Sequence, residues 1–190
     1  MPRLDHFSLV APIYDRVIKA KDLTALASLA RLEGHERVLD AGGGTGRIGF
    51  GLKGRAGQMV VADPSLAMLS FARGKNGLAP VACLAEALPF PPASFDRVIM
   101  VDAFHHVSSQ TKTLLEFCRV LKAGGLLVIE EPDIRQVLVK IVALAERLLL
   151  MRSRFRNASW MAEHLSSHGV QTSIHRDGHT IWVVAQKGPA

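Results

Sequence analysis

Apolar runs of strand length alternate with helix-length amphipathic segments along most of the chain. The predicted strands are RVLDA (37–41), QMVVAD (58–63), PVACLA (80–85), FDRVIMVDA (95–103) and LLVIEE (126–131). This alternation predicts βαβ units, in which a parallel sheet is covered by helices on both faces. The expected fold class is therefore α/β.

The last part of the chain predicts a different kind of pairing. The runs VQTSIHRDG (170–178) and HTIWVVAQK (179–187) meet at the step Asp177–Gly178, which is a strong signal for a β-hairpin. A mostly parallel sheet of seven strands that ends in an antiparallel hairpin is thus expected. With 190 residues, 48% of them hydrophobic, the economical interpretation is one domain over residues 1–190, which begins with a helical cap at 1–33.

Charge and cysteine content exclude several function classes. Most of the net charge of +6 arises in the apolar segment 135–156, which holds six cations and one anion. This segment suits a membrane surface or an anionic substrate, or is a solvated helix end, and it does not suit nucleic acid. The two cysteines, Cys83 and Cys118, suggest no disulfide framework, and the first residues lack a secretory signal, so a cytoplasmic location is expected.

A glycine-rich stretch after the first strand contains two overlapping fingerprints. From Gly44 it gives GTGRIG, which matches the dinucleotide motif G-x-G-x-x-G. From Asp40 it gives an acid followed by alternating glycines. A carboxylate at this point would repel a pyrophosphate but would suit a cationic ligand end, and the final hairpin leaves little room for a dehydrogenase's second half. The register that begins with Asp40 is therefore favoured.

Five segments in this order resemble class I S-adenosylmethionine-dependent methyltransferases, in particular the branch of ubiquinone and menaquinone biosynthesis methyltransferases (methyltransferase type 11). They are VLDAGGGTG (38–46), VVADPSLAML (60–69), AEALPFPPASFDRVI (85–99), DAFHHV (102–107) and CRVLKAGGLLVIEE (118–131). FSLVAPIYD (7–15) is similar to the N-terminal segment of that branch. The resemblance implies a Rossmann-like fold, S-adenosylmethionine as the cofactor, and a helical lid at 132–168.

The resemblance also implies a set of cofactor-binding residues. Glycines without a Cβ let the backbone approach the amino-acid end and the ribose, while a carboxylate after the second strand accepts both ribose hydroxyls. Leu84 stands where relatives usually place an acid that binds the adenine amine, so backbone groups at Ala85 or the Glu86 carboxylate would have to replace it. The expected cofactor-binding residues are Asp40, Gly42, Gly44, Gly46, Asp63, Pro64, Ala85, Glu86 and Asp102.

Methyl transfer from a sulfonium needs an aligned acceptor and the exclusion of water, and it needs a general base only if the acceptor must lose a proton. His106 matches the histidine most typical of the family and is the candidate base, with ordinary packing of its ring as the alternative. Tyr14 resembles a tyrosine that folds over the cofactor, or it anchors an N-terminal helix. The scattered histidines call for no metal.

The sequence leaves the acceptor open. The apolar lid would suit a small apolar or aromatic molecule, and segment 135–156 could instead contact a membrane or a second copy of the chain in a homodimer. Methyl transfer to a small molecule is the favoured function. A catalytically inactive cofactor-binding or partner protein with the same fold is the alternative, and a dehydrogenase comes last.

Overall fold

The structure is a computed structural model, and it describes residues 23–134 and 154–189. Its strands are β1 (Arg37–Ala41), β2 (Gln58–Asp63), β3 (Leu78–Ala82), β4 (Phe95–Val101), β5 (Leu121–Pro132), β6 (Val170–Asp177) and β7 (Thr180–Lys187). Its helices are α2 (Thr24–Leu29), α3 (Arg47–Leu52), α4 (Leu66–Arg73), α5 (Gln110–Val120) and α7 (Ala158–Ser166), with short 3₁₀ turns η1 (Lys53–Arg55) and η2 (Phe104–His106).

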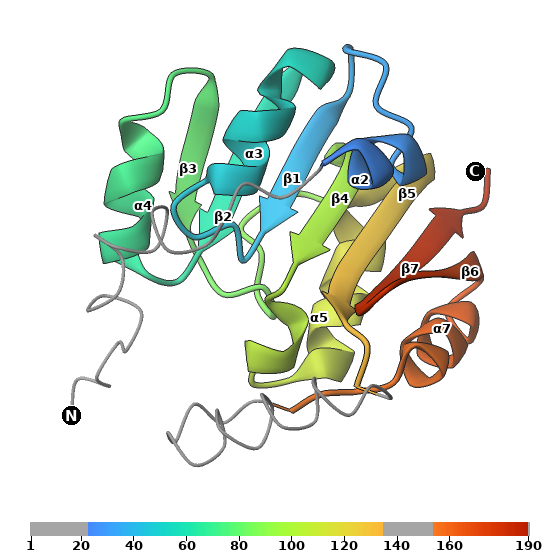
Figure 1. Cartoon of the computed structure of the whole chain (residues 1–190). Coiled ribbons are helices and arrows are strands. Elements are labelled where there is room, and N and C mark those ends of the chain that lie inside the picture. Colours follow the sequence, from blue (N-terminus) through green and yellow to red (C-terminus); the bar gives the residue numbers. More distant parts are fainter. Residues whose placement is uncertain (1–22, 135–153, 190) are drawn as a thin grey trace.

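All seven strands form one sheet in the order β3-β2-β1-β4-β5-β7-β6 (Figure 1). Strands β1 to β5 are parallel to one another, whereas β7 is antiparallel to both β5 and β6. The β6–β7 hairpin turns at Gly178 and His179, next to the predicted step, and Asp177 pairs with Thr180. The expected fold class, a Rossmann-like sheet of seven strands with a C-terminal antiparallel hairpin, is confirmed.

The core lies on both faces of the sheet because successive residues of a strand point to opposite sides. Val38 belongs to a cluster with α2 and α3, and its neighbour Leu39 belongs to a second cluster with α5 and α7. Helix α4 packs on Val61 of β2 through Leu69. Helices therefore cover both faces, and they leave the carboxyl ends of the parallel strands as the edge where ligands bind in such sheets (Figure 1).

The glycine pair Gly124–Gly125 before the run LLVIEE predicts that the preceding helix ends there, but the structure differs at this junction of α5 and β5. Helix α5 already ends at Val120, and Leu121 is buried and pairs with Phe95 at the start of β5. The register then shifts, so that the next pair is Arg97 with Leu126. The two glycines thus lie in an irregular part of β5, where Gly124 has a φ of +73° that few other residues adopt.

Strand β3 also begins and ends earlier than predicted, at 78–82 in place of 80–85. Residues Leu78–Ala82 pair with Met59–Asp63 of β2 in a parallel register. Pro80 is tolerated because β3 is at the edge of the sheet, where its missing N–H costs no ladder bond. The shift frees residues 83–86 to form a loop at the carboxyl edge.

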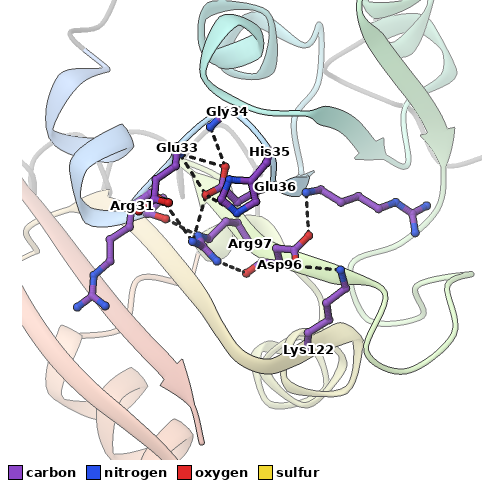
Figure 2. Close-up of polar contacts among 10 residues, drawn as sticks. Arg31, Glu33, Gly34, His35, Glu36, Asp96, Arg97 and Lys122 are labelled. Atoms are coloured by element: carbon purple, nitrogen blue, oxygen red, sulfur yellow. Dashed lines mark hydrogen bonds and ion pairs between the residues drawn. The ribbon is translucent and has the colours of Figure 1, made fainter. Parts of the chain in front are cut away.

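An ion-pair network fixes the start of β1 to β4 and to the end of α2 (Figure 2). Arg97 donates from Nε to the Ala30 carbonyl at 2.6 Å and from Nη2 to the Arg31 carbonyl at 3.1 Å. The same Nη2 lies 3.3 Å from Oε1 of Glu36, a fully buried carboxylate that also accepts the Glu33 and Gly34 amides. Arg97 therefore satisfies carbonyls at the end of α2 and a buried charge at the same time.

Replacing Arg97 with Met should destabilise the protein by about 2–4 kcal/mol, because the buried Glu36 charge loses its partner. Burial raises the pKa of Glu36, but the amides of Glu33, Gly34 and Glu36 itself, together with Arg97, outweigh it and hold the pKa below its usual value. The wild-type contribution is therefore present above the normal glutamate pKa and is lost as the pH falls through the lowered folded-state value. Urea unfolding at neutral and acidic pH measures both effects. Arg55→Met, at an exposed cation of η1, should change stability by less than about 0.5 kcal/mol, and an equally small effect of Arg97→Met would contradict the assignment.

Candidate functional site

A cavity of about 400 Å³ opens at the carboxyl edge of the sheet, beside the ends of β1, β2 and β4. Four chain segments line it: the loop from β1 to α3, the β2–α4 connection, the loop after β3 and the loop after β4. Its volume is in the range of small-molecule and cofactor sites. The lining includes eight of the nine expected cofactor-binding residues and the expected base, namely Asp40, Gly42, Gly44, Asp63, Pro64, Ala85, Glu86, Asp102 and His106.

The glycine loop is held against β2 by its own backbone. The amides of Gly42 and Gly43 both donate to the Ala62 carbonyl, at 2.7 and 3.2 Å. Gly42 has a φ of +69°, and a Cβ at this position would lie 2.7 Å from the Cβ of Ala103 in the loop after β4. Only glycine lets these two segments approach so closely, and this approach forms one wall of the cavity.

Gly46 is the expected residue that does not line the cavity. It precedes the first residue of α3 with a φ of +73°, and a Cβ there would lie 2.6 Å from Cδ1 of Leu78 and 3.1 Å from Cβ of Ala72. Its lack of a side chain allows α3 to pack on β3 and α4. A direct role of Gly46 in cofactor binding stays a prediction.

The Asp40 side chain is buried beneath the glycine loop, and 1% of the residue's surface is exposed. Its Oδ2 accepts the Gly49 amide at 3.0 Å, and a Cβ on Gly49 would lie 3.2 Å from the same oxygen. Burial and, to a smaller extent, the negative charge of Asp63 raise the pKa of Asp40 to about 7 against the opposing effects of the Gly49 amide and Arg47. A cation placed in the cavity beside Asp40 would favour the charged form of this carboxyl.

Asp63 is the last residue of β2, and backbone contacts fix both of its carboxylate oxygens. Oδ2 accepts the Gly44 amide at 2.9 Å, and Oδ1 accepts the Ser65 amide at 2.8 Å. Each oxygen has a second lone pair, so the carboxylate can still accept hydroxyl groups of a ligand. The contact with Gly44 joins the β1 and β2 segments of the site.

The loop after β3 brings Leu84, Ala85 and Glu86 to the cavity. Leu84 is 54% exposed, whereas Ala85 is buried. Oε1 of Glu86 accepts the amides of Ser108 and Ser109, at 2.6 and 3.1 Å. Glu86 therefore holds the loop after β4 in place, a structural contact that adds to its position in the lining.

The loop after β4 carries Asp102 and His106 into the lining. Asp102 has a φ of +51°, a conformation that is uncommon for residues other than glycine but less so for aspartate. Burial, together with the neighbouring His105, lowers the pKa of His106 to about 4. The His106 ring is thus neutral at physiological pH, and it binds a proton too weakly to be an effective base there.

A buried acid–histidine pair, which was not predicted from the sequence, lies behind this loop. Nδ1 of His105 lies 2.5 Å from Oε2 of Glu131 at the end of β5, and Oε1 of the same carboxylate accepts the Phe104 amide at 2.8 Å. The His105 ring stacks on Phe155 with the centroids 4.2 Å apart. The acids at the end of the LLVIEE run were the available signal, because a charge at the end of a buried strand needs a partner.

One group of side chains among the described residues has the composition of a metal site. Ligand atoms of Glu33, His35 and Glu36 lie within 4.8 Å of one another, at the network shown in Figure 2. Glu36 is already satisfied by two backbone amides and by Arg97, whose cation lies 3.3 Å away and would repel a metal ion. We therefore interpret this group as structural. Within residues 23–134 and 154–189, no helix has both the length and the apolar character needed to cross a membrane.

Comparisons with known proteins agree with this geometry. Residues 39–129 match the family model of a methyltransferase domain. The ubiquinone/menaquinone biosynthesis C-methyltransferase of Xanthomonas oryzae pv. oryzae is 41% identical over 106 residues, which cover 50% of this chain and 42% of that protein. The protein of the same name from Xylella fastidiosa is 36% identical over 145 residues, or 64% and 57% of the two chains. The chain thus spans about half the length of these curated relatives.

Solved structures show the same fold. One match is a chain in a complex between the Haloferax volcanii Trm112 methyltransferase activator and a protein described as a methyltransferase. It aligns with a TM-score of 0.81 and 20% sequence identity, and the alignment covers 97% of this chain and 98% of that one. An S-adenosylmethionine-dependent methyltransferase from Thermotoga maritima aligns with a TM-score of 0.74 and 22% sequence identity. The alignment covers 87% of this chain and 88% of that one.

Over residues 39–129 the chain is therefore similar to a methyltransferase domain. S-adenosylmethionine is the cofactor expected in the cavity. The cavity wall includes Asp40, which begins the favoured register of the glycine stretch, and also Thr45, Arg47 and Ile48 from the other register. The match agrees with the resemblance seen in the sequence. Tyr14 and residues 135–153 of the basic segment lie outside the described residues, so their expected roles stay predictions.

Asp40→Asn tests the burial of the carboxyl beneath the glycine loop. Because the folded-state pKa of about 7 is above the usual aspartate value, the folded protein binds the extra proton, and wild-type stability should fall as the pH rises from about 4 to 7. The amide of Asn cannot ionise, so the variant should gain stability relative to wild type over this interval. Urea unfolding at pH 4.5, 6 and 8 measures the difference, and a difference that does not change with pH would contradict the raised pKa.

Proposed function

We propose that this chain binds S-adenosylmethionine in the cavity at the carboxyl edge and transfers its methyl group to a small molecule. The observation that supports this most is the convergence of Asp40, the glycine loop and Asp63 on one cavity of about 400 Å³ in a methyltransferase domain. When bound, the cofactor supplies a methyl group on a positively charged sulfur. The residues of the chain need only align the acceptor and exclude water.

Each part of the cavity wall suits one part of the cofactor. The loop at Gly42 and Gly44 would take the amino-acid end, near the buried Asp40 carboxyl, while the Asp63 carboxylate at the end of β2 would accept the ribose hydroxyls. Pro64 would lie against the adenine.

The loop after β3 forms another part of the cavity wall. Ala85 and Glu86 would face the base edge, and Asp102 would complete the wall on the β4 side. Leu84, at the exposed rim, would give the adenine an apolar contact in place of the usual acid.

A small apolar or aromatic acceptor is the second part of the proposal. The names of the curated relatives point to a quinone-related molecule and to methylation of a carbon atom. In such a step the bond from sulfur to the methyl group would break as the new carbon–carbon bond forms, and the acceptor carbon would then release its proton to solvent. The low pKa of His106 favours a positioning role for this ring over a role as the base. The hypothesis has four further parts: a contact of Tyr14 with the cofactor, a homodimer, a membrane contact through 135–156 and a cytoplasmic location.

Calorimetric titration with S-adenosylhomocysteine tests the cofactor site. Asp63→Ala should weaken binding at least about 100-fold, since two charge-assisted hydrogen bonds of roughly 1.5–3 kcal/mol each are lost. Glu86→Ala should cost less, because its carboxylate already holds the Ser108 and Ser109 amides. Thermal unfolding without ligand identifies a variant that fails to fold. Equal and negligible effects of both substitutions would overturn the placement of the cofactor against Asp63. In the same thermal unfolding assay, NAD should not protect the wild-type protein.

Proton release measures whether the cationic end of the cofactor lies beside Asp40. At pH 6.5 this carboxyl is largely protonated in the free protein, and a nearby ammonium would lower its pKa and expel the proton. The binding enthalpy of wild type should therefore depend on the ionisation enthalpy of the buffer, with up to one proton released per site. Asp40→Asn should lose this dependence, and an unchanged dependence in the variant would contradict the placement.

A further inference from the structure

A second and smaller hollow, of about 150 Å³, lies at the start of helix α5. Its wall consists of residues 108–111, which lead into the helix, and of Arg154, Arg156 and Trp160 from the segment before and within α7. Ser108 lines both this hollow and the main cavity, so the two are neighbours. The lining is polar apart from the Trp160 ring, which distinguishes it from the largely apolar main cavity.

The backbone that carries the two arginines is fixed to the methyltransferase domain. The Arg154 amide donates to the His105 carbonyl at 2.8 Å, and Nε2 of Gln110 donates to the Arg154 carbonyl at 2.6 Å. Nε of Arg156 donates to Oε1 of Gln110 at 3.2 Å, and its guanidinium lies 4.7 Å from the centre of the Trp160 ring. Gln110 thus joins both arginines to the first turn of α5.

The hollow concentrates positive charge that the described residues do not neutralise. In the ranges 23–134 and 154–189, neither the Arg154 nor the Arg156 guanidinium forms an ion pair with a carboxylate, and Arg156 uses only its Nε in a hydrogen bond. Glu86 is an acid that contacts the wall of the hollow, where its carboxylate accepts the amides of Ser108 and Ser109. The donors of two forked guanidinium groups therefore stay available, and guanidinium geometry matches carboxylate and phosphate oxygens.

We propose that this hollow is an oxyanion subsite that binds the phosphate or carboxylate group of a small molecule. The two guanidinium groups supply the charge, and the positive end of the α5 dipole adds to it. The stacked Trp160 ring and the Gln110 contact hold Arg156 in place, which reduces the side-chain entropy lost on binding.

The shared wall at Ser108 connects the subsite with methyl transfer, and this step rests on the proposed function. A molecule whose oxyanion lies in the hollow can extend its apolar body past Ser108 and Val107 into the main cavity. The acceptor class would then be an aromatic or apolar molecule that carries one acidic group. The positive hollow would select such an acceptor against its neutral analogue.

Titration of the isotope-labelled full chain with phenyl phosphate and with inorganic phosphate tests the subsite, with the amide shifts of residues 108–111 and the Trp160 indole shift as readouts. Both probes should give saturable shifts, and Arg154→Gln and Arg156→Gln should each weaken binding at least about tenfold. The matched control is Lys112→Gln, which removes one exposed charge from the same helical turn without lining the hollow, and it should change affinity less than about twofold.

The two probes distinguish the sources of the oxyanion. Phenyl phosphate that binds at least about tenfold tighter than inorganic phosphate, and that also shifts the amides of Ala103 and Val107, would support an oxyanion on the acceptor. Equal affinities, with no shift at those two residues, would indicate a site for the free ion and would overturn the link to the acceptor. Shifts that do not saturate, or that respond equally to all three substitutions, would overturn the subsite itself.

Binding of S-adenosylhomocysteine to the same samples separates this proposal from the proposed function. The two arginine variants should bind it within about twofold of wild type, since neither arginine lines the main cavity, which also verifies that they are folded. If wild type fails to bind S-adenosylhomocysteine, the methyltransferase proposal fails, while the phosphate titration still decides whether the hollow binds oxyanions.

Discussion

The buried carboxyl of Asp40 is the contact on which the ligand edge of this protein depends. It belongs to the last residue but one of β1, accepts the Gly49 amide from α3, and lies directly beneath the glycine loop. Burying a carboxylate with one amide partner is unfavourable, and the raised pKa expresses that cost. The protein keeps this unfavourable charge at the place where a cationic ligand would relieve it, which is how binding sites commonly differ from the rest of a core.

The sequence predicted most of the fold because local patterns determine most of it. The strands around Leu39 and Val60 are short and apolar, and the step Asp177–Gly178 marks a tight turn, so their positions needed no tertiary information. The errors occurred at Gly124 and at the start of β3. At both places pairing with a distant strand decided the conformation: Leu121 pairs with Phe95, and Leu78 pairs with Met59.

The site followed a similar division. Residues within the glycine stretch and at the end of β2 could be assigned from motifs, because the motif fixes both the residue type and its place at the carboxyl edge. The contact of Glu131 with His105 and that of Gln110 with Arg154 join segments 26 and 44 residues apart. Neither pair has a local pattern, so the arginine-lined hollow became visible only in three dimensions. Gly46 shows the opposite case, in which a motif glycine lies outside the cavity and serves packing.

The final hairpin has a further consequence for the sheet. Strand β5 lies between β4 and β7 and is paired along both edges, with seven residues from Leu126 to Pro132 facing β7 (Figure 1). If the hairpin were lost to proteolysis, the apolar run at the centre of β5 would become an open edge that could pair with another chain. The last strands therefore protect the protein from self-association, and a shortened product would be a candidate for aggregation even where its ligand edge remained intact.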